Sequence, residues 1–261
     1  MRRFLVFAIS ALYGCGTVAR AQDTFSFVLF DAGSGAFVSA GGSCIDGDAI
    51  EGGAACVSAV VPGVGVVHTQ SYFHPDNQAL GTRLLRAGLS AKPLLDSLTT
   101  ADVSLTPSFR QYAVVTADGR TAAYTGDECA AWAGHRRGKG YVLAGNILLD
   151  STILETMERA LRDARAGGAN LYEQARATLA AAAAPGADRR CLSEGVSSRS
   201  CFLRLALASD GVSALVIDER VLFPDAGEDP IVTLLRRLDR RVDEGAVATA
   251  LREDAPPLGG E

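Results

Sequence analysis

The first strand-like segment of the chain is apolar on both of its faces. Residues 24–30 read TFSFVLF, so that Phe25 and Phe27 alternate with Val28 and Phe30. Successive side chains of a strand point to opposite faces, and a strand of this kind needs an apolar layer on each side. The segment therefore predicts a sheet that is buried between two layers.

The order of the remaining elements favours an antiparallel α+β domain. Aromatic and β-branched runs bounded by glycine or proline predict further strands at 36–40, 57–61, 65–69, 111–116, 120–124, 141–148, 202–208 and 212–217. Apolar residues at helical spacing predict helices at 78–89, 90–98, 152–164, 170–185 and 230–242. The strands are joined by hairpin signals such as Asp118-Gly119 and Asp210-Gly211 rather than by regular βαβ crossovers.

Short sequence signals predict where several helices begin and where one long loop lies. Ser90, Asn170 and Asp229 precede helical runs and are suited to N-capping. Thr152 and Glu155 have the spacing of a capping box. The stretch 126–140 is rich in glycine and is expected to be a loop.

The N-terminus has the organisation of a secretory signal peptide. Arg2-Arg3 precede the apolar run Phe4–Tyr13, and the small-residue site Ala19-Arg20-Ala21 follows. The run has ten residues, about half of the ~20 that span a bilayer. We therefore expect a signal peptide at 1–21, a single domain at 22–245 and a flexible tail at 246–261. The protein would be periplasmic or secreted, with no integral membrane span; lipidation at Cys15 is an alternative.

Composition narrows the function classes. The chain is 48% hydrophobic and 21% charged, which is typical of a globular domain, and its formal net charge is −5. An acidic chain lacks the basic face that phosphate binding requires, so nucleic acid is not expected as a partner. The three histidines follow no familiar zinc spacing. We expect neither a metal nor a cofactor.

Export would place the cysteines in an oxidising compartment. Cys15 leaves with the signal peptide, and the simplest short-loop pairing of the others is Cys44 with Cys56 and Cys191 with Cys201, leaving Cys129 over. Other connectivities are also compatible with the sequence, because spacing alone does not determine pairing.

A series of motifs in order gives the chain a resemblance to a known family. The motifs are TFSFV at 24–28, the turn at Asp31, VGVVHTQSY at 64–72, LLRAG at 84–88, RQY at 110–112, YTG at 124–126, WAGH at 132–135, GNIL at 145–148 and GADRRC at 186–191. Together they resemble the bacterial domain of unknown function 1028, which is grouped with the N-terminal-nucleophile (Ntn) hydrolases. The resemblance covers residue 24 to about residue 209. It implies a four-layer αββα sandwich of two antiparallel sheets between helical layers.

By analogy with the superfamily, the resemblance implies hydrolysis of an amide bond in a peptide or small molecule, with Thr24 as the nucleophile. A threonine hydroxyl needs a base, and an α-amine on the same residue has a suitable pKa, near 7.7–8.0. This mechanism requires Thr24 to be the first residue, so Gln22-Asp23 must be removed after signal cleavage, either by attack of Thr24 on the preceding carbonyl or by an aminopeptidase. In the alternative, Thr24 is an ordinary strand residue and the protein is a non-catalytic exported module that binds cell-wall or small ligands.

Several other residues are candidates for the site. Asn146 is expected to donate to the tetrahedral oxyanion, and Gln70 and Ser43 are further candidates because they lie at strand ends or beside glycines. We expect the basic side chains of His135, Arg110 and Arg190 to bind the substrate.

Three further expectations concern charge, an alternative nucleophile and assembly. Some superfamily relatives carry a lysine near the end of the second strand, where this chain has Ser43-Cys44, so another basic residue would have to supply that positive charge.

Cys129 with a nearby histidine is an alternative nucleophile. The apolar face of 231–242 could support a homo-oligomer.

Overall fold

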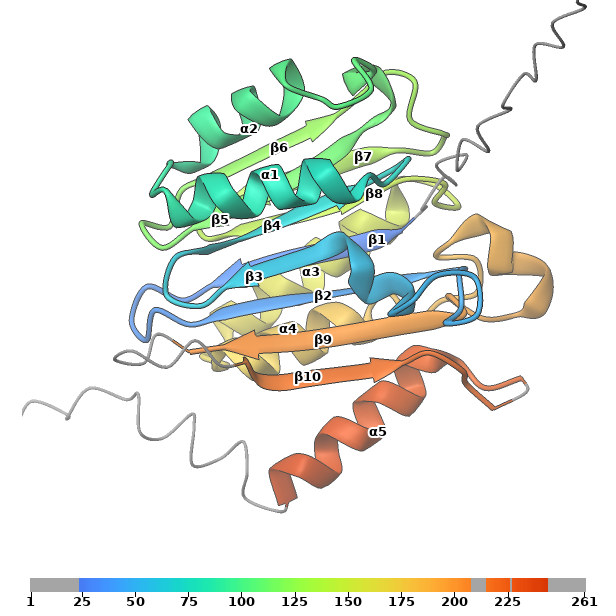
Figure 1. Ribbon diagram of the computed structural model, residues 1–261. Helices are drawn as coiled ribbons and strands as arrows, with labels where there is room; N and C mark the ends of the chain where they lie inside the picture. Colours follow the sequence, from blue (N-terminus) through green and yellow to red (C-terminus); the bar gives the residue numbers. More distant parts are fainter. Residues whose placement is uncertain (1–23, 208–214, 226, 244–261) are drawn as a thin grey trace, which may run out of the picture.

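Two antiparallel sheets are stacked face to face with helices on their outer faces (Figure 1). The computed structural model describes residues 24–207, 215–225 and 227–243. In order across the sheet, the strands of the six-stranded sheet are β10 (Leu215–Val221), β9 (Ser200–Ala206), β2 (Phe37–Ser43), β1 (Phe25–Phe30), β8 (Tyr141–Gly145) and β7 (Gly134–Gly138). The strands of the four-stranded sheet are β3 (Ser58–Val61), β4 (Gly65–Gln70), β5 (Gln111–Thr116) and β6 (Thr121–Thr125).

The helices form the two outer layers. Helices α1 (Pro75–Arg86) and α2 (Ala91–Thr100) pack on the four-stranded sheet. Helices α3 (Thr152–Ala166), α4 (Leu171–Ala180) and α5 (Pro230–Asp243) pack on the six-stranded sheet. Short 3₁₀ helices lie at η1 (Gly53–Val57), η2 (Pro107–Phe109) and η3 (Arg189–Glu194). The α+β class that the order of elements predicted and the αββα layering that the family resemblance implied are confirmed.

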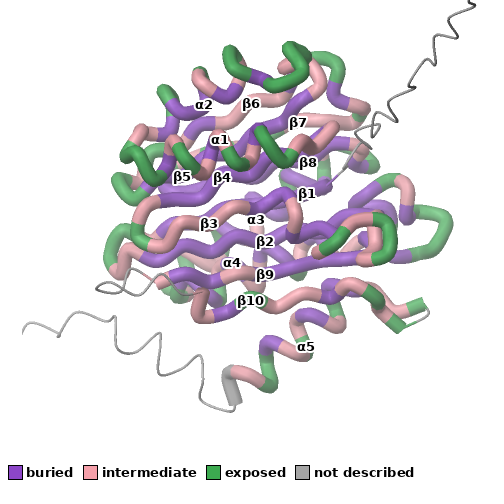
Figure 2. Tube along the Cα trace, viewed as in Figure 1, coloured by how far each residue is buried: buried purple, intermediate pink, exposed green. Residues whose placement is uncertain are grey.

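The central strand β1 is buried on both faces, as its sequence predicts. All six of its residues are buried, and Figure 2 shows the central strands of both sheets as buried along most of their length. Phe25, Phe27 and Leu29 face the helices of the six-stranded sheet, whereas Val28 and Phe30 face the other sheet. Apolar side chains from both sheets fill this inner layer: Val28, Phe30, Phe37, Val66, Ala113, Val115, Val142 and Ala144.

Two local predictions are wrong. The stretch 126–140 was expected to be a loop, but its second half forms the edge strand β7. An edge strand is paired on one side only, so it tolerates polar side chains, and Arg136 of β7 binds Glu158 of α3 at 2.6 Å. The predicted capping box at Thr152 is also wrong. Thr152 bonds to Asp150 instead, and the helix begins after Ser151 without a side-chain cap.

The other predicted helix starts agree with the structure. Asn170 and Glu173 form a complete capping box at the start of α4. At the start of α5, Asp229 Oδ1 accepts a hydrogen bond from the Ile231 N–H at 2.9 Å. Helix α2 begins directly after Ser90, although the Ser90 side chain makes no capping bond.

The predicted disulfide pairing is wrong. Cys44 is bonded to Cys191, 147 residues away in sequence, with Cα atoms 5.7 Å apart. The prediction paired near neighbours in sequence, whereas the fold places the end of β2 beside η3. Cys201 instead lies in the core on β9, and burial raises the pKa of its thiol. Such a bond is typical of proteins from oxidising compartments.

Other predictions concern segments outside the described residues, namely the signal peptide, the Asp210-Gly211 turn and the C-terminal tail. Within the described parts of the chain, no helix has the length and apolar character that a membrane crossing requires. The apolar face of α5, which was considered as an interface, packs on the six-stranded sheet through Ile231, Leu234 and Leu238.

Candidate active site

The inner layer between the sheets changes from apolar to polar along the strands. Side chains on the same face as Val28 continue through Ser26 to Thr24, and the neighbouring strands show the same change. The buried polar side chains at this end, each at most 1% exposed, are Thr24, Ser26, Ser39, Ser43, His68, Gln70, Gln111 and Asn146. Buried polar groups cost free energy unless they are hydrogen-bonded, so this concentration marks a candidate site.

Thr24 lies directly before β1, between the ends of two neighbouring strands. Phe25 is paired with Gly42 of β2 and with Gly145 of β8, so Thr24 is flanked by Ser43 and Asn146. The Thr24 carbonyl accepts hydrogen bonds from the Asn146 N–H at 3.1 Å and from Gln70 Nε2 at 3.3 Å. Thr24 Oγ1 is buried and has no hydrogen-bond partner.

Gln111 connects the two sheets through both ends of its amide. Its Nε2 donates to the carbonyls of Gly134 at 3.0 Å and Gly145 at 2.9 Å. Its Oε1 accepts from Gln70 Nε2 at 2.6 Å and from Asn146 Nδ2 at 3.0 Å. One amide N–H of Asn146 is therefore occupied, and its Oδ1 is a buried acceptor without a partner.

A second part of the network runs deeper between the sheets. Ser26 Oγ donates to Gln70 Oε1 at 2.6 Å and contacts His68 Nδ1 at 2.9 Å. On the other side of the ring, His68 Nε2 contacts Ser39 Oγ at 2.7 Å. Burial, with a smaller contribution from the charge of Arg204, lowers the pKa of His68 to about 3. The imidazole is therefore neutral at physiological pH.

On the Ser43 side of Thr24 lies an ion pair between a buried carboxylate and a partly exposed arginine. Asp188 is fully buried, binds Arg190 at 2.7 Å and accepts from the Cys44 N–H at 2.7 Å. Arg190 also reaches Ser43 Oγ at 3.4 Å. The Cys44–Cys191 disulfide links the strand end directly to η3, which begins beside this ion pair.

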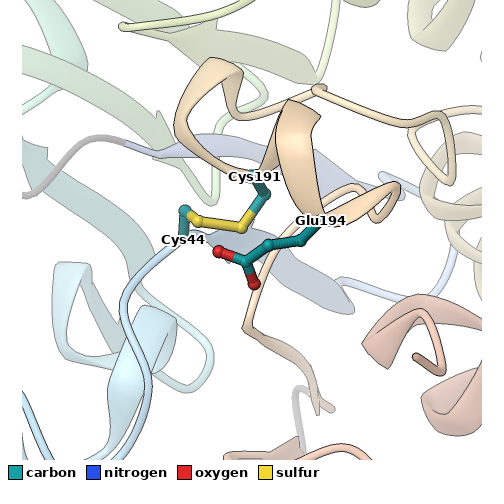
Figure 3. A group of neighbouring side chains, drawn as sticks. All are labelled: Cys44, Cys191 and Glu194. Atoms are coloured by element: carbon teal, nitrogen blue, oxygen red, sulfur yellow. A yellow bond between two sulfur atoms is a disulfide. The ribbon is translucent and has the colours of Figure 1, made fainter. Parts of the chain in front are cut away.

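The disulfide and Glu194 form a compact group (Figure 3). Cys44, Cys191 and Glu194 bring ligand-type atoms within 4.8 Å of one another. Metal ligation by cysteine requires a thiolate, which the oxidised pair does not offer, and Glu194 binds Arg199 at 2.6 Å. This geometry serves to hold η3 against β2.

The remaining predicted site residues lie outside this cluster. Arg110 is 3% exposed and binds Asp102 at 2.8 Å and the carbonyl of Tyr72. His135 is exposed on β7 and bonds through Nδ1 to Thr125 Oγ1 at 2.9 Å, and Thr125 in turn accepts from Gln111. Of the three predicted basic residues, Arg190 is the one in contact with the residues beside Thr24.

The alternative nucleophile lies elsewhere. Cys129 is buried, and its Sγ donates to the Arg110 carbonyl at 3.3 Å. His135, the histidine nearest to it in sequence, bonds to Thr125.

Four residues of this network were not predicted as site residues: Ser26, Ser39, His68 and Gln111. A signal was present, because polar residues recur at every second position in otherwise apolar strands, as in Thr24/Ser26 and His68/Gln70. This period places them on one face of each strand. What the sequence could not show is which strand faces are opposed.

The fold defines the general class. Two antiparallel sheets between helical layers, with the polar site at the start of β1, form the αββα sandwich that the sequence resemblance implied. The model of the family of unknown function DUF1028 matches residues 24–234, so this chain belongs to that family.

The structural comparisons include a solved structure from this family. The crystal structure of protein SPO2555 from Silicibacter pomeroyi, assigned to DUF1028, is similar with a TM-score of 0.66 at 19% identity, over 84% of this chain and 86% of that one. Its likeness supports the fold.

Two further solved structures are weaker matches. Anbu (ancestral beta-subunit) from Yersinia bercovieri has a TM-score of 0.45 at 12% identity, over 91% of this chain and 100% of that one. An Anbu (Gly-1) mutant from Hyphomicrobium has a TM-score of 0.44 at 11% identity, over 87% and 99%. A comparison with curated proteins found no match.

Proposed function

We propose that this protein is an exported amidohydrolase that cleaves an amide or peptide bond with Thr24 Oγ1 as its nucleophile. The active form begins at Thr24, after removal of the residues that precede it. The substrate is a peptide or small-molecule amide, and the chemistry described below requires no cofactor.

One observation carries the proposal. The network at the polar end of the inner layer satisfies nearly all of its own donors and acceptors, yet Thr24 Oγ1 and Asn146 Oδ1 remain buried without partners. Buried polar atoms are rarely left in this state, and those that are call for an explanation. A nucleophile and an acceptor awaiting an α-amine or a substrate account for both atoms.

The reaction is an acyl transfer to Thr24 followed by hydrolysis. Oγ1 attacks the amide carbon while its proton moves to the α-amine of the same residue. The C–N bond then breaks, the leaving amine takes the proton, and an acyl ester remains on Thr24. Water attacks the ester carbon and releases the acid, and its proton restores the threonine hydroxyl.

Asn146 and Gln70 have distinct roles in this scheme. The backbone N–H of Asn146 and the Nε2 of Gln70 hold the Thr24 carbonyl and so orient the nucleophile. Asn146 Oδ1 accepts an N–H of the α-amine, which directs the amine lone pair toward Oγ1. The amide N–H of Asn146 that is not bound to Gln111 serves the oxyanion.

Arg190 supplies positive charge near Ser43, where this chain has no lysine. A nearby cation disfavours protonation of an amine and would lower its pKa. Because Asp188 partly neutralises Arg190, we expect this effect to be smaller than that of an isolated cation.

The test is labelling by a serine- or threonine-directed acylating probe, followed by peptide mapping. We expect one adduct, on Thr24 of the processed chain, and no adduct in Thr24→Ala. Thr69→Ala is the matched control, because Thr69 is equally buried and its Oγ1 also lacks a partner, but it points to the other face of β4. A processed Thr24 that never labels would contradict the proposal and favour the non-catalytic binding module.

A further inference from the structure

Two backbone carbonyls determine which atom is the donor in each hydrogen bond of the buried network. A carbonyl oxygen only accepts hydrogen bonds, so the Gln111 atom that contacts Gly134 and Gly145 must be Nε2. The other end of the amide is then Oε1, an acceptor. Gln70 and Asn146 must therefore both present an N–H to it.

The orientation of the Gln70 amide in turn determines which nitrogen of the His68 imidazole carries the proton. With Gln70 Nε2 directed to Gln111 and to the Thr24 carbonyl, Gln70 Oε1 faces Ser26 and accepts its hydroxyl proton. Ser26 has only one proton to give, so its contact with His68 Nδ1 requires the ring nitrogen to be the donor.

The hydrogen bonds at Nε2 of His68 agree with a proton on Nδ1. A neutral imidazole that carries its proton on Nδ1 accepts at Nε2, so Ser39 donates to it. Ser58 then donates to Ser39 across 2.7 Å. The imidazole is fully buried, which disfavours the charged form that would donate at both nitrogens.

We propose that His68 is a positioning residue, held as the neutral Nδ1–H tautomer, whose donation to Ser26 locks the Gln70 amide with Nε2 against the Thr24 carbonyl. Without this donor, the Ser26 hydroxyl can rotate away from Gln70 Oε1, and the Gln70 amide is then held only through its Nε2 contacts with Gln111 and Thr24. His68 does not touch Thr24, so its effect is on the orientation of the nucleophile. The part of the inference that concerns reactivity rests on the proposed function, whereas the tautomer and the Gln70 orientation do not.

The first test is the ¹⁵N NMR spectrum of the imidazole in the full chain. We expect Nδ1 to be protonated and Nε2 to be unprotonated, without titration, from about pH 5 to about pH 8. Protonation on Nε2, or titration within this range, would overturn the inference. This readout is valid even if Thr24 has no catalytic activity.

The second test compares two polar substitutions. His68→Asn places an amide near the Nδ1 position and can keep the donor to Ser26, whereas His68→Gln places its amide near the Nε2 position. We expect the side-chain amide resonances of Gln70 to be retained in His68→Asn and shifted in His68→Gln. Equal Gln70 resonances in both variants would overturn the inference, and circular dichroism would confirm that each variant is folded.

The same pair tests the link to reactivity. Where Thr24 labels, we expect acylation to slow by about tenfold or more in His68→Gln, with little change in the probe concentration giving half-maximal rate. His68→Asn should stay close to the parent. Labelling equally fast in both variants would contradict the positioning role, whereas absence of labelling in the parent would contradict only the proposed function.

Discussion

At the scale of single residues, the type of a residue was not enough to predict whether its side chain lies in the site. Arg110 was expected to bind substrate, but it is buried against Asp102, together with Tyr112 and Asn77. Arg190 was grouped with it on the same grounds, yet Arg190 lies beside Ser43. Both arginines stand within the sequence motifs, and their environments differ only because distant segments of the chain pack around them differently.

The Asp102–Arg110 pair predicts a specific dependence of stability on pH. Burial alone would raise the pKa of Asp102, but hydrogen bonds from Arg110, Thr106 and Ser104 outweigh it and lower the pKa from 3.8 to about 2. Since the folded-state pKa is depressed, this stabilisation is complete above the unfolded-state pKa and is lost as the pH falls toward 2. It amounts to about 2 kcal/mol.

Urea titrations between about pH 5 and pH 2 measure this effect. The parent chain should lose more unfolding free energy over this range than Asp102→Asn, which lacks the carboxylate. Asp96→Asn, which removes an exposed carboxylate on α2, is the matched control and should retain the steep dependence. An Asp102→Asn curve parallel to that of the parent would refute the assignment.

At the scale of elements, the sequence was most informative where the signal is local. The hairpin at Asp118-Gly119 and the capping box at Asn170 depend on neighbouring residues, and both agree with the structure. The disulfide depends on a contact between distant segments and was mispredicted. The edge strand β7 was also mispredicted, although it pairs with the next strand β8 in a local hairpin, because its sequence GHRRG lacks the apolar residues typical of a strand. No spacing rule could have paired Cys44 with Cys191.

The Cys44–Cys191 bond should be a major source of stability. It closes a long loop, since the two cysteines are 147 residues apart, and chain-entropy arguments give about 2–5 kcal/mol for such a bond. We expect Cys44→Ala and Cys191→Ala to lower the unfolding free energy by this amount. A reductant should destabilise the parent but have little further effect on either variant.

Peptide mapping under non-reducing conditions identifies the bond directly. A linked peptide containing Cys44 and Cys191 is expected. A Cys44–Cys56 peptide would contradict the structure and restore the short-loop pairing.

Helix capping gives an independent comparison. Asn170 makes both bonds of a capping box, so Asn170→Ala should cost about 1 kcal/mol of unfolding free energy. Ser90 makes no side-chain capping bond, so Ser90→Ala should change the unfolding free energy much less. Equal losses in denaturant titrations would show that the two helix starts do not differ as described.

At the scale of the whole molecule, the two apolar faces of β1 anticipated the layered architecture, because such a strand needs cover on both sides. The site was anticipated only in part. Thr24, Asn146, Gln70 and Ser43 are brought together at one end of the inner layer. Gln111 and His68, which orient them, were not predicted. The hydrogen-bond partners of a polar residue in a strand can be identified only when the facing sheet is known.

The proposed mechanism depends above all on where the mature chain begins. Thr24 can use its own α-amine as a base only if it is the first residue. Expression with the native N-terminus, followed by N-terminal sequencing and intact mass measurement of the exported protein, tests this directly. We expect the parent chain to begin at Thr24. A fully active protein that retains Gln22-Asp23 at its N-terminus would contradict this mechanism.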